Sequence, residues 1–309
     1  MLDFERITIE KKEALERYLY AYGENSCQHS FATMYCMCRK YGDMTCEKDG
    51  FLYILRSGRC TEAERVYLFP MGDISDADAL RRAIGEILED AHAHGARACF
   101  ETLTKRAKDA LLAAFPGQFL VEEVRDYAEY LYTRDKLALL PGHGMASKRH
   151  DINTFFRDYG DRVRVEAMGP EHLDSVRSFQ REWLEEKEHG EEDVQLELEN
   201  EAIQRGLGCF EALGLSGICV YIDGKLRGYA YGAPLSADCY DVMIEKGDRC
   251  IPDIYRVLNR DLVRICCRDY AWINREEDVG VEGLRRAKLS YKPDLLLEKY
   301  IVKEASQGE

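Results

Sequence analysis

Residues 274–293, NREEDVGVEGLRRAKLSYKP, hold nine charged side chains and two glycines. Glu277 and Asp278 are carboxylates that can take a proton from an incoming amine, so they are candidate catalytic bases. Arg285 and Lys288 are three residues apart and share a face if the segment is helical. On such a face they can hold the phosphates of a substrate. The stretch therefore contains groups that can accept a proton and groups that can bind an anionic substrate.

The same stretch also permits a purely structural interpretation. Asn274 is a candidate substrate-binding residue, but with Glu277 it has the spacing of a helix-capping box. An ordinary surface helix would pair Glu282 with Arg286, which contributes little stability. Glycine lowers helix stability by up to ~1 kcal/mol, so two glycines near one helix start favour a geometric role.

Two other pairs of neighbouring residues are candidates for the site. Glu245, a candidate catalytic carboxylate, and Lys246, a candidate substrate-binding residue, end an expected strand and face opposite sides of its sheet. Lys148 and Arg149 precede an apolar helix face and are candidates for binding a phosphate or a carboxylate. A salt bridge at a domain junction would explain the second pair equally well.

Aromatic residues supply the remaining candidates. Tyr229 and Tyr291 can line a substrate pocket. Aromatic residues in strands more often belong to the core, and this alternative stays open for both tyrosines.

No metal site is expected. The twelve cysteines are scattered and mostly lie in apolar segments, where a large cytosolic chain uses them as small buried side chains. The nearest pattern, Cys36, Cys38 and Cys46 near His29, lacks the spacing of a zinc site.

The composition indicates an ordinary soluble globular protein. The 309 residues suffice for one large or two ordinary domains, and 46% are hydrophobic and 32% charged. No apolar run approaches the ~18 residues of a membrane span, and the N-terminus carries acids where a signal peptide needs bases. We therefore expect a cytoplasmic protein without membrane insertion; its oligomeric state is left open.

The formal charge of −14 disfavours indiscriminate nucleic-acid binding. The charge is uneven, because the acidic segment 181–201 carries ten acids against two bases. The negative net charge is therefore compatible with local basic surfaces elsewhere on the protein.

Seven segments rich in aromatic and β-branched residues are expected to be strands: 51–57, 65–71, 96–103, 217–223, 226–234, 240–246 and 270–274. Apolar residues recur every three or four positions in 76–95 and 252–269, which predicts amphipathic helices. The Asp-Gly pair within 222–228 predicts a hairpin turn.

Two windows, 66–103 and 241–277, follow one plan: a strand ends in Gly-Asp, a helix follows, and another strand begins. A duplicated strand–helix–strand unit is the economical explanation. Since hairpin strands precede each unit, we expect an α/β (α+β) fold with two mixed sheets and helices on both faces. Pro/Gly punctuation at 139–147 divides the chain into domains 1–142 and 143–309.

Three segments carry a family resemblance: SKRHDINTFFRDYG (147–160), IEKGDRCIPDIYRVLNRDL (244–262) and NREEDVGVEGLRRAKLSYKPDLLLEKY (274–300). Together they resemble a bacterial family, the soluble relatives of the phosphatidylglycerol lysyltransferase C-terminal domain. The most specific string is Asn-x-x-Glu-Asp-x-Gly-x-x-Gly-Leu-Arg-x-x-Lys, at 274–288.

This resemblance implies two tandem acetyltransferase-type (GNAT) domains, arranged as in the Fem-type peptidyltransferases. It implies an acyltransferase that moves an aminoacyl group from aminoacyl-tRNA to an amine or hydroxyl of a small-molecule or peptide acceptor, without a tightly bound cofactor. It also implies that the C-terminal segment LLLEKYIVKE completes the sheet of the other half.

The chain departs from the family pattern in places. His150-Asp151 stands where relatives have Asn-His, and the turn after 240–246 differs at Gly247 and Pro252. Members that modify lipids are fused to membrane segments, so a lipid acceptor does not carry over.

Two alternatives stay open at this point. One is an acyl-CoA-dependent N-acyltransferase of a small amine, although neither strand-to-helix turn has the glycine-spaced loop that cradles pyrophosphate. The other is a catalytically silent ligand-binding protein of the same fold.

Overall fold

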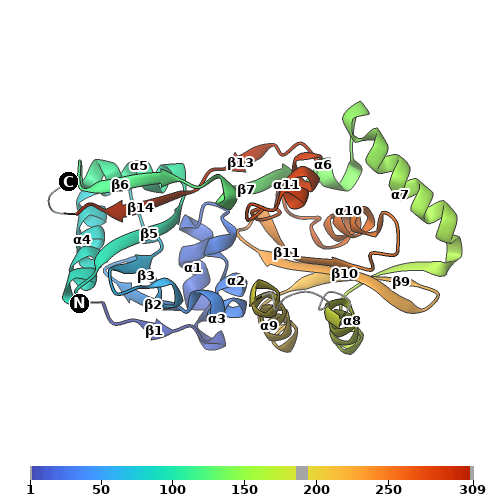
Figure 1. Ribbon diagram of the computed structural model, residues 1–309, viewed down its shortest axis with the longest axis horizontal. Helices are drawn as coiled ribbons and strands as arrows, with labels where there is room; N and C mark the ends of the chain where they lie inside the picture. Colours follow the sequence, from blue (N-terminus) through green and yellow to red (C-terminus); the bar gives the residue numbers. More distant parts are fainter. Residues whose placement is uncertain (1, 186–193, 307–309) are drawn as a thin grey trace. The chain divides into compact units, whose positions relative to one another are not determined.

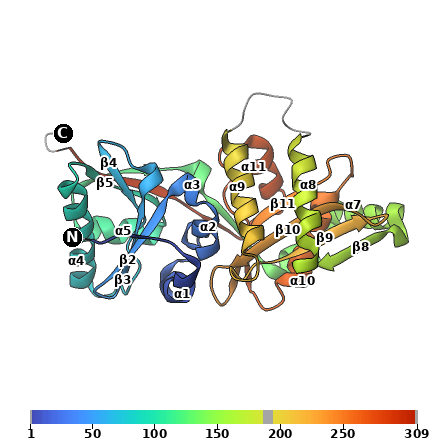
Figure 2. The same cartoon turned by 90° about the horizontal axis from the view of Figure 1, so that it is seen from below.

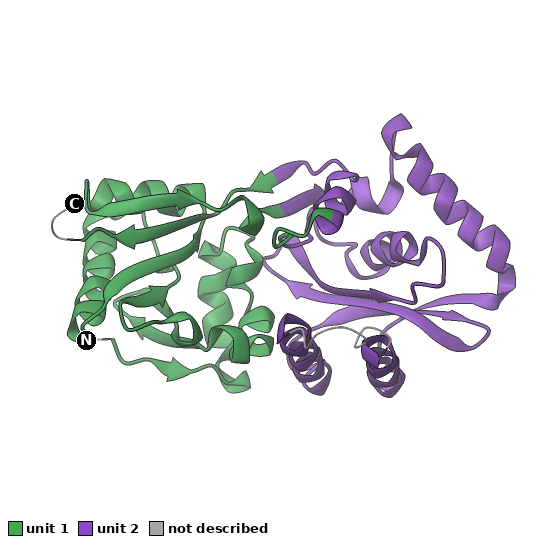
Figure 3. Ribbon diagram, viewed as in Figure 1, with its two compact units in different colours: residues 1–129, 277–282, 296–309 green, residues 130–276, 283–295 purple. Residues whose placement is uncertain are grey.

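The structure is a computed structural model that describes residues 2–185 and 194–306 (Figure 1). Part of the acidic segment 181–201 therefore lies outside the described residues. Within the described ranges the strands form two seven-stranded sheets. The chain separates into two compact units, coloured in Figure 3: unit 1 is residues 1–129, 277–282 and 296–309, and unit 2 is residues 130–276 and 283–295. The division predicted between residues 142 and 143 stays a prediction.

The first sheet belongs to unit 1. Its strands, in spatial order, are β1 (Glu5–Arg6), β2 (Asp43–Lys48), β3 (Phe51–Arg56), β4 (Glu64–Tyr67), β5 (Arg97–Leu103), β14 (Tyr300–Glu304) and β6 (Phe119–Glu123). The helices of this unit are α1 (Lys12–Tyr22), α2 (Phe31–Cys36), α3 (Cys38–Tyr41), α4 (Ala77–Ala93) and α5 (Lys105–Ala114). Apolar side chains of α4 and α5 share one core with β3, β4, β5 and β14.

The second sheet belongs mainly to unit 2. Its strands, in spatial order, are β8 (Val163–Ala167), β9 (Ser216–Ile222), β10 (Lys225–Pro234), β11 (Cys239–Gly247), β12 (Trp272–Asn274), β7 (Glu129–Thr133) and β13 (Leu295–Leu297). The helices are α6 (Arg134–Leu139), α7 (Ala146–Tyr159), α8 (Leu173–Glu185), α9 (Val194–Gly208), α10 (Ile254–Cys266) and α11 (Glu282–Leu289). Figures 1 and 2 show α10 on one face of this sheet and α8 and α9 on the other.

The two sheets have the same strand order, and each takes one strand from the other half of the sequence. The C-terminal β14 lies between β5 and β6, and β7, from the first half, lies between β12 and β13. The duplication and the placement of the C-terminal strand in the other half's sheet are thus confirmed. In each sheet a parallel pair joins the ends of the repeated strand–helix–strand unit: β4 with β5 in the first sheet and β11 with β12 in the second.

Local sequence explains these repeated units. In α4, buried Leu80, Ile84 and Ile87 recur at helical spacing, and the Asp76 side chain caps the first turn by accepting from two backbone N–H groups. The β9–β10 hairpin turns at Asp223 and Gly224, which have φ of 54° and 76°. Both values suit the tight turn that the Asp-Gly pair predicts.

Glycine permits close packing of α10 on its sheet. A Cβ on Gly247 would lie 2.7 Å from the Cγ2 of Ile254, the first residue of α10. A larger residue at this position would push the helix away from the strand.

Among the described residues, no helix has the length and apolar character to cross a bilayer.

One buried histidine gives unit 1 a pH-sensitive element. His29 ends the short 3-10 helix Cys27–His29, and its Nδ1 lies 2.7 Å from the Gly23 carbonyl oxygen. Burial, and then the charge of Lys299, lower the pKa of His29 from 6.5 to about 4. The folded protein therefore holds this imidazole neutral.

Unfolding should become easier as the pH falls from 6.5 towards 4, because the unfolded chain protonates His29 in this window and the folded state resists. From this group alone, the free energy of unfolding should be about 2 kcal/mol lower at about pH 5 than at about pH 7.5. Urea denaturation of His29→Gln should show most of this pH dependence removed. The exposed His150→Gln serves as control, and an unchanged slope for His29→Gln would contradict the assignment.

The exchanged strand β14 should contribute directly to stability. Val302 is fully buried in the core of unit 1, whereas its neighbour Ile301 is only half-buried. Val302→Ala should lower the free energy of unfolding by about 2 kcal/mol, and Ile301→Ala by distinctly less. Equal and small losses in denaturant titrations would show that β14 is not an integral strand.

Candidate functional site

The predicted catalytic carboxylate Glu245 lies in β11 and pairs with Arg275. Glu245 Oε2 lies 2.5 Å from Arg275 Nη2, and both side chains are largely buried. With its amide oxygen turned towards the guanidinium, Asn259 accepts from Arg275 Nε at 2.9 Å. Burial alone would lower the pKa of Arg275, but Glu245 and the Tyr132 and Tyr291 hydroxyls raise it. The guanidinium is therefore held charged inside unit 2.

This ion pair bridges β11 and β12 where the two strands part. Their parallel pairing ends with Asp241 opposite Asn274. The next backbone N–H, that of Arg275, donates to the Tyr130 carbonyl in β7, while β11 continues beside β10. Charged side chains thus fill the gap between the diverging strands of unit 2.

The equivalent gap in unit 1 is hollow. The strands β4 and β5 part after Tyr67 opposite Phe100. Beyond that point the chain turns along β3, where the Met71 N–H donates to the Leu52 carbonyl. A small cavity of about 20 Å³ lies there, and its lining includes residues 69–72 and 102–104.

Four cations lie near one another in unit 2, and we call Lys148, Arg256, Arg275 and Lys292 the cationic cluster. Lys148 Nζ lies 4.5 Å and Arg275 Cζ 5.3 Å from the centroid of the Tyr291 ring. Burial lowers the pKa of Lys148, and the charges of Arg256, Lys292 and Arg275 lower it further. This part of unit 2 is therefore electropositive.

Acidic residues neutralise only part of the cationic cluster. Arg256 pairs with Asp151 at 3.4 Å. Lys148 donates to the Ser290 carbonyl at 2.8 Å. In residues 2–185 and 194–306, neither Lys148 nor Lys292 has a carboxylate within ion-pair distance. The two ammonium groups can therefore receive an anion from solution.

Lys288 supports the backbone beneath this cluster. Its ammonium is buried and donates to the Arg275 carbonyl at 2.6 Å, and the Tyr132 hydroxyl donates to the Lys288 carbonyl at 2.7 Å. Arg285, on the same helix, is half-exposed. Arg285 and Lys288, which were predicted to share a helix face, thus differ in exposure, because the Lys288 side chain points into unit 2.

Asn274 starts no helix. Its side-chain oxygen accepts from the Glu276 N–H at 2.7 Å and closes a turn, and α11 begins only at Glu282. The capping-box interpretation is therefore wrong. The buried Asn274 positions the chain directly after β12.

Lys246 and Tyr229 lie on the other face of the sheet. Lys246 Nζ lies 2.7 Å from a Glu199 oxygen and 4.1 Å from the centroid of the Trp183 ring. The Tyr229 hydroxyl is buried and donates to Gln180 at 2.7 Å. All three partners belong to α8 and α9, so the prediction that Glu245 and Lys246 face opposite sides is confirmed. Lys246 and Tyr229 therefore do not lie with the cationic cluster.

Arg149 lies beside Lys148 in the sequence but makes different contacts. Its guanidinium donates to the carbonyls of Leu140 and, at 2.7 Å, Gly142. It thereby holds the turn between α6 and α7.

Asp278 and its neighbours attach loop 277–282 to unit 1. The Asp278 side chain is fully buried, 3.4 Å from Arg125, and accepts from the Gly280 N–H at 3.0 Å. The Val279 N–H donates to the Asp126 carbonyl at 3.1 Å. The contacts of Asp278 are those of a residue that shapes a loop.

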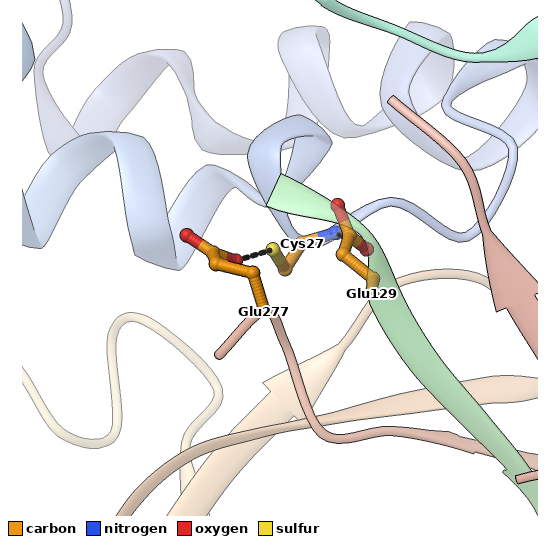
Figure 4. A group of neighbouring side chains, drawn as sticks. All are labelled: Cys27, Glu129 and Glu277. Atoms are coloured by element: carbon orange, nitrogen blue, oxygen red, sulfur yellow. Dashed lines mark hydrogen bonds between the residues drawn. The ribbon is translucent and has the colours of Figure 1, made fainter. Parts of the chain in front are cut away.

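Glu277, Cys27 and Glu129 form a compact group in unit 1 (Figure 4). Cys27 Sγ donates to Glu277 at 3.3 Å, and the Cys27 N–H donates to Glu129 at 2.9 Å. Their ligand-type atoms lie within 4.8 Å of one another. However, the ammonium of Lys299 lies 2.5 Å from Glu129, with neither side chain exposed. A metal ion here would face that buried positive charge, so the arrangement fits an ion pair better than a metal centre.

Glu277 also borders a second cavity of unit 1, of about 70 Å³. Its walls carry cationic, anionic and amide side chains, among them Gln28, Lys40, Arg56, Arg59 and Glu101. Sequence patterns did not single out Arg56 or Arg59. The available signal was an arginine closing the apolar strand FLYILR. Arg275 was likewise missed, although it lies within the specific string at 274–288.

Comparisons with known proteins agree with the predicted resemblance. Residues 20–303 match the family described as "Phosphatidylglycerol lysyltransferase, C-terminal". The uncharacterized protein MYCGA3080 of Mycoplasmoides gallisepticum is 24% identical over 181 residues, which are 56% of this chain and 55% of that protein. The chain thus matches about half the length of this curated relative.

Solved structures with the same fold cover nearly the whole chain. A conserved protein of unknown function from Bacteroides thetaiotaomicron is 29% identical, with a TM-score of 0.92 over 99% of this chain and 100% of that one. FemX is 9% identical, with a TM-score of 0.65 over 99% and 98% of the two chains. A tandem GNAT protein from the clavulanic acid biosynthesis pathway is 11% identical, with a TM-score of 0.50 over 100% and 99%. The chain therefore belongs to the phosphatidylglycerol lysyltransferase C-terminal family and has a tandem GNAT-like fold.

Proposed function

We propose that this protein is an acyltransferase that moves an aminoacyl group from aminoacyl-tRNA to an amine or hydroxyl acceptor. Family and fold support the transferase class. The observation that carries the choice of donor is the cationic cluster, where Lys148 and Lys292 face no described carboxylate at ion-pair distance. The chain carries a net charge of −14, so a polyanionic donor requires such a local electropositive surface.

Aminoacyl transfer requires few catalytic groups because the donor ester is already activated. The acceptor nitrogen attacks the ester carbonyl, the carbon–oxygen bond to the terminal ribose breaks, and the ribose hydroxyl leaves with a proton. The nitrogen loses one proton, and we assign Glu245 as the base that accepts it. Arg275 holds this carboxylate fixed in direction, so it can orient the attacking amine.

The cationic cluster would hold the phosphates of the donor's terminal nucleotides. Arg256 and Arg275, which pair with Asp151 and Glu245, add positive charge to this surface. Lys148 and Lys292 add ammonium charges beside them. The Tyr291 ring beneath Lys148 and Arg275 limits how far these two cations can move.

One observation favours a second candidate, acyl-CoA-dependent N-acylation. The gap between β4 and β5 in unit 1 contains a small cavity, whereas the equivalent gap in unit 2 is filled by the Glu245–Arg275 pair. Against it, three aspartates, Asp73, Asp76 and Asp78, surround the start of α4 and would repel a pyrophosphate. We therefore rank this candidate second.

Binding of purified protein to aminoacyl-tRNA should depend on the cationic cluster. Lys148→Ala and Lys292→Ala should each weaken binding roughly tenfold, the loss of one charge-assisted contact, and lower the salt slope by about 1. Equilibrium binding at several salt concentrations measures both quantities. Lys225→Ala, an exposed lysine of unit 2 in the β9–β10 hairpin, is the matched control.

The same binding assay separates the two donors. Failure to bind aminoacyl-tRNA, or equal binding by all variants, would contradict the proposal. Binding of acyl-CoA instead would establish the second candidate. Transfer is then measured as loss of a radiolabelled aminoacyl ester that requires a supplied amine, and Glu245→Gln should slow it without changing tRNA affinity.

A further inference from the structure

The second cavity of unit 1 has a buried guanidinium in its wall. Arg56, at the end of β3, is 1% exposed, and its Nη2 donates to Gln28 at 2.7 Å. Its Nε and Nη1 lie 3.4 and 3.8 Å from Asp43 and Glu101, with Nε lacking a hydrogen bond. A guanidinium has five N–H groups to satisfy, and leaving them unmade in a buried place is costly. Arg56 therefore gives this wall a buried positive charge with an unsatisfied N–H group.

Two further cations border the same cavity. Arg59 donates to Glu101 at 2.9 Å and keeps 42% of its side chain exposed. Lys40 lies with its ammonium 4.9 Å from the centroid of the Tyr41 ring. Paired guanidinium groups suit a carboxylate, which they can bind with two parallel hydrogen bonds. This end of the cavity fits a carboxylate.

A carboxylate of the protein borders the cavity as well. The Glu277 oxygens accept from Gln28 Nε2 at 3.4 Å and from Cys27 Sγ at 3.3 Å. Glu277 thus places a carboxylate at the wall of the cavity, where a ligand ammonium can form a charge-assisted hydrogen bond with it.

Thr102 adds an independent sign of a missing partner. It borders the cavity, is 5% exposed, and its hydroxyl has no hydrogen-bond partner among the described residues. Its φ of 56° is rare for a β-branched residue and coincides with an irregularity in the pairing of β5 with β14. Buried hydroxyls normally have a hydrogen-bond partner. At this irregular part of β5, a polar ligand could supply the partner that the Thr102 hydroxyl lacks.

We propose that this cavity binds a free α-amino acid. Its carboxylate lies against Arg56 and Arg59, its ammonium faces Glu277, and one of these two groups engages Thr102. The cavity, of about 70 Å³ and open to solvent, has room for the two charged groups of one such molecule. The side chains involved all belong to unit 1, and binding requires no donor, so the site stands whether or not aminoacyl transfer does.

Calorimetric titration of the full chain with each of the twenty common free L-amino acids tests the proposal. At least one should bind, and its N-acetyl and carboxamide derivatives should each bind at least tenfold more weakly, since each lacks one of the two charges. If none of the twenty binds, or if either derivative binds as well as the parent amino acid, the proposal is overturned.

Variants place the ligand in this cavity. Arg59→Ala and Glu277→Gln should each weaken binding at least tenfold, whereas Lys105→Ala, on the exposed face of α5, should not. Thr102→Val keeps the shape and removes only the hydroxyl. It should preserve or raise the melting temperature while weakening binding several-fold. Unchanged binding in Arg59→Ala and Glu277→Gln would place the amino acid elsewhere and refute the site.

Discussion

A buried ion pair joins the two points at which the chain changes sheets. Glu129 is the first residue of β7, and Lys299 comes just before β14. Their charged groups lie 2.5 Å apart with no exposed surface, and the Ser26 hydroxyl and Cys27 N–H complete the acceptor bonds of Glu129. Removing two ions from water costs several kcal/mol each, so neither charge tolerates burial without the other. Both segments must therefore be in place for either charge to be buried.

The exchange gives two sheets of equal strand order but different chemistry at equivalent places. In unit 1 the gap between β4 and β5 is hollow, and a second cavity nearby has Arg56 in its wall. In unit 2 the corresponding gap is closed by Arg275 and Glu245, with the cationic cluster beside it. The two sheets thus have equivalent gaps between their strands. A few side chains decide whether such a gap contains a cavity or a buried ion pair.

Features that depend on neighbours in the sequence could be predicted. The helices α4 and α10, the strands around them and the Asp223-Gly224 turn follow from apolar periodicity and turn chemistry, which act over a few residues. The opposite orientation of Glu245 and Lys246 follows from strand geometry alone. The specific string at 274–288 contains Arg275, but spacing cannot reveal that its side chain reaches Glu245 on another strand.

Local pattern and composition were enough to identify the family, the duplicated unit and the residue types available for group transfer. They do not show which charges are already paired in the folded protein. Asp278 and Lys288 have the types expected of site residues, yet one is bound to Arg125 and the other to the Arg275 carbonyl. Lys148 instead lies against the Tyr291 ring without a described carboxylate partner. The physical reason is that burial and ion pairing depend on residues far apart in the chain, which meet only after the sheets have assembled.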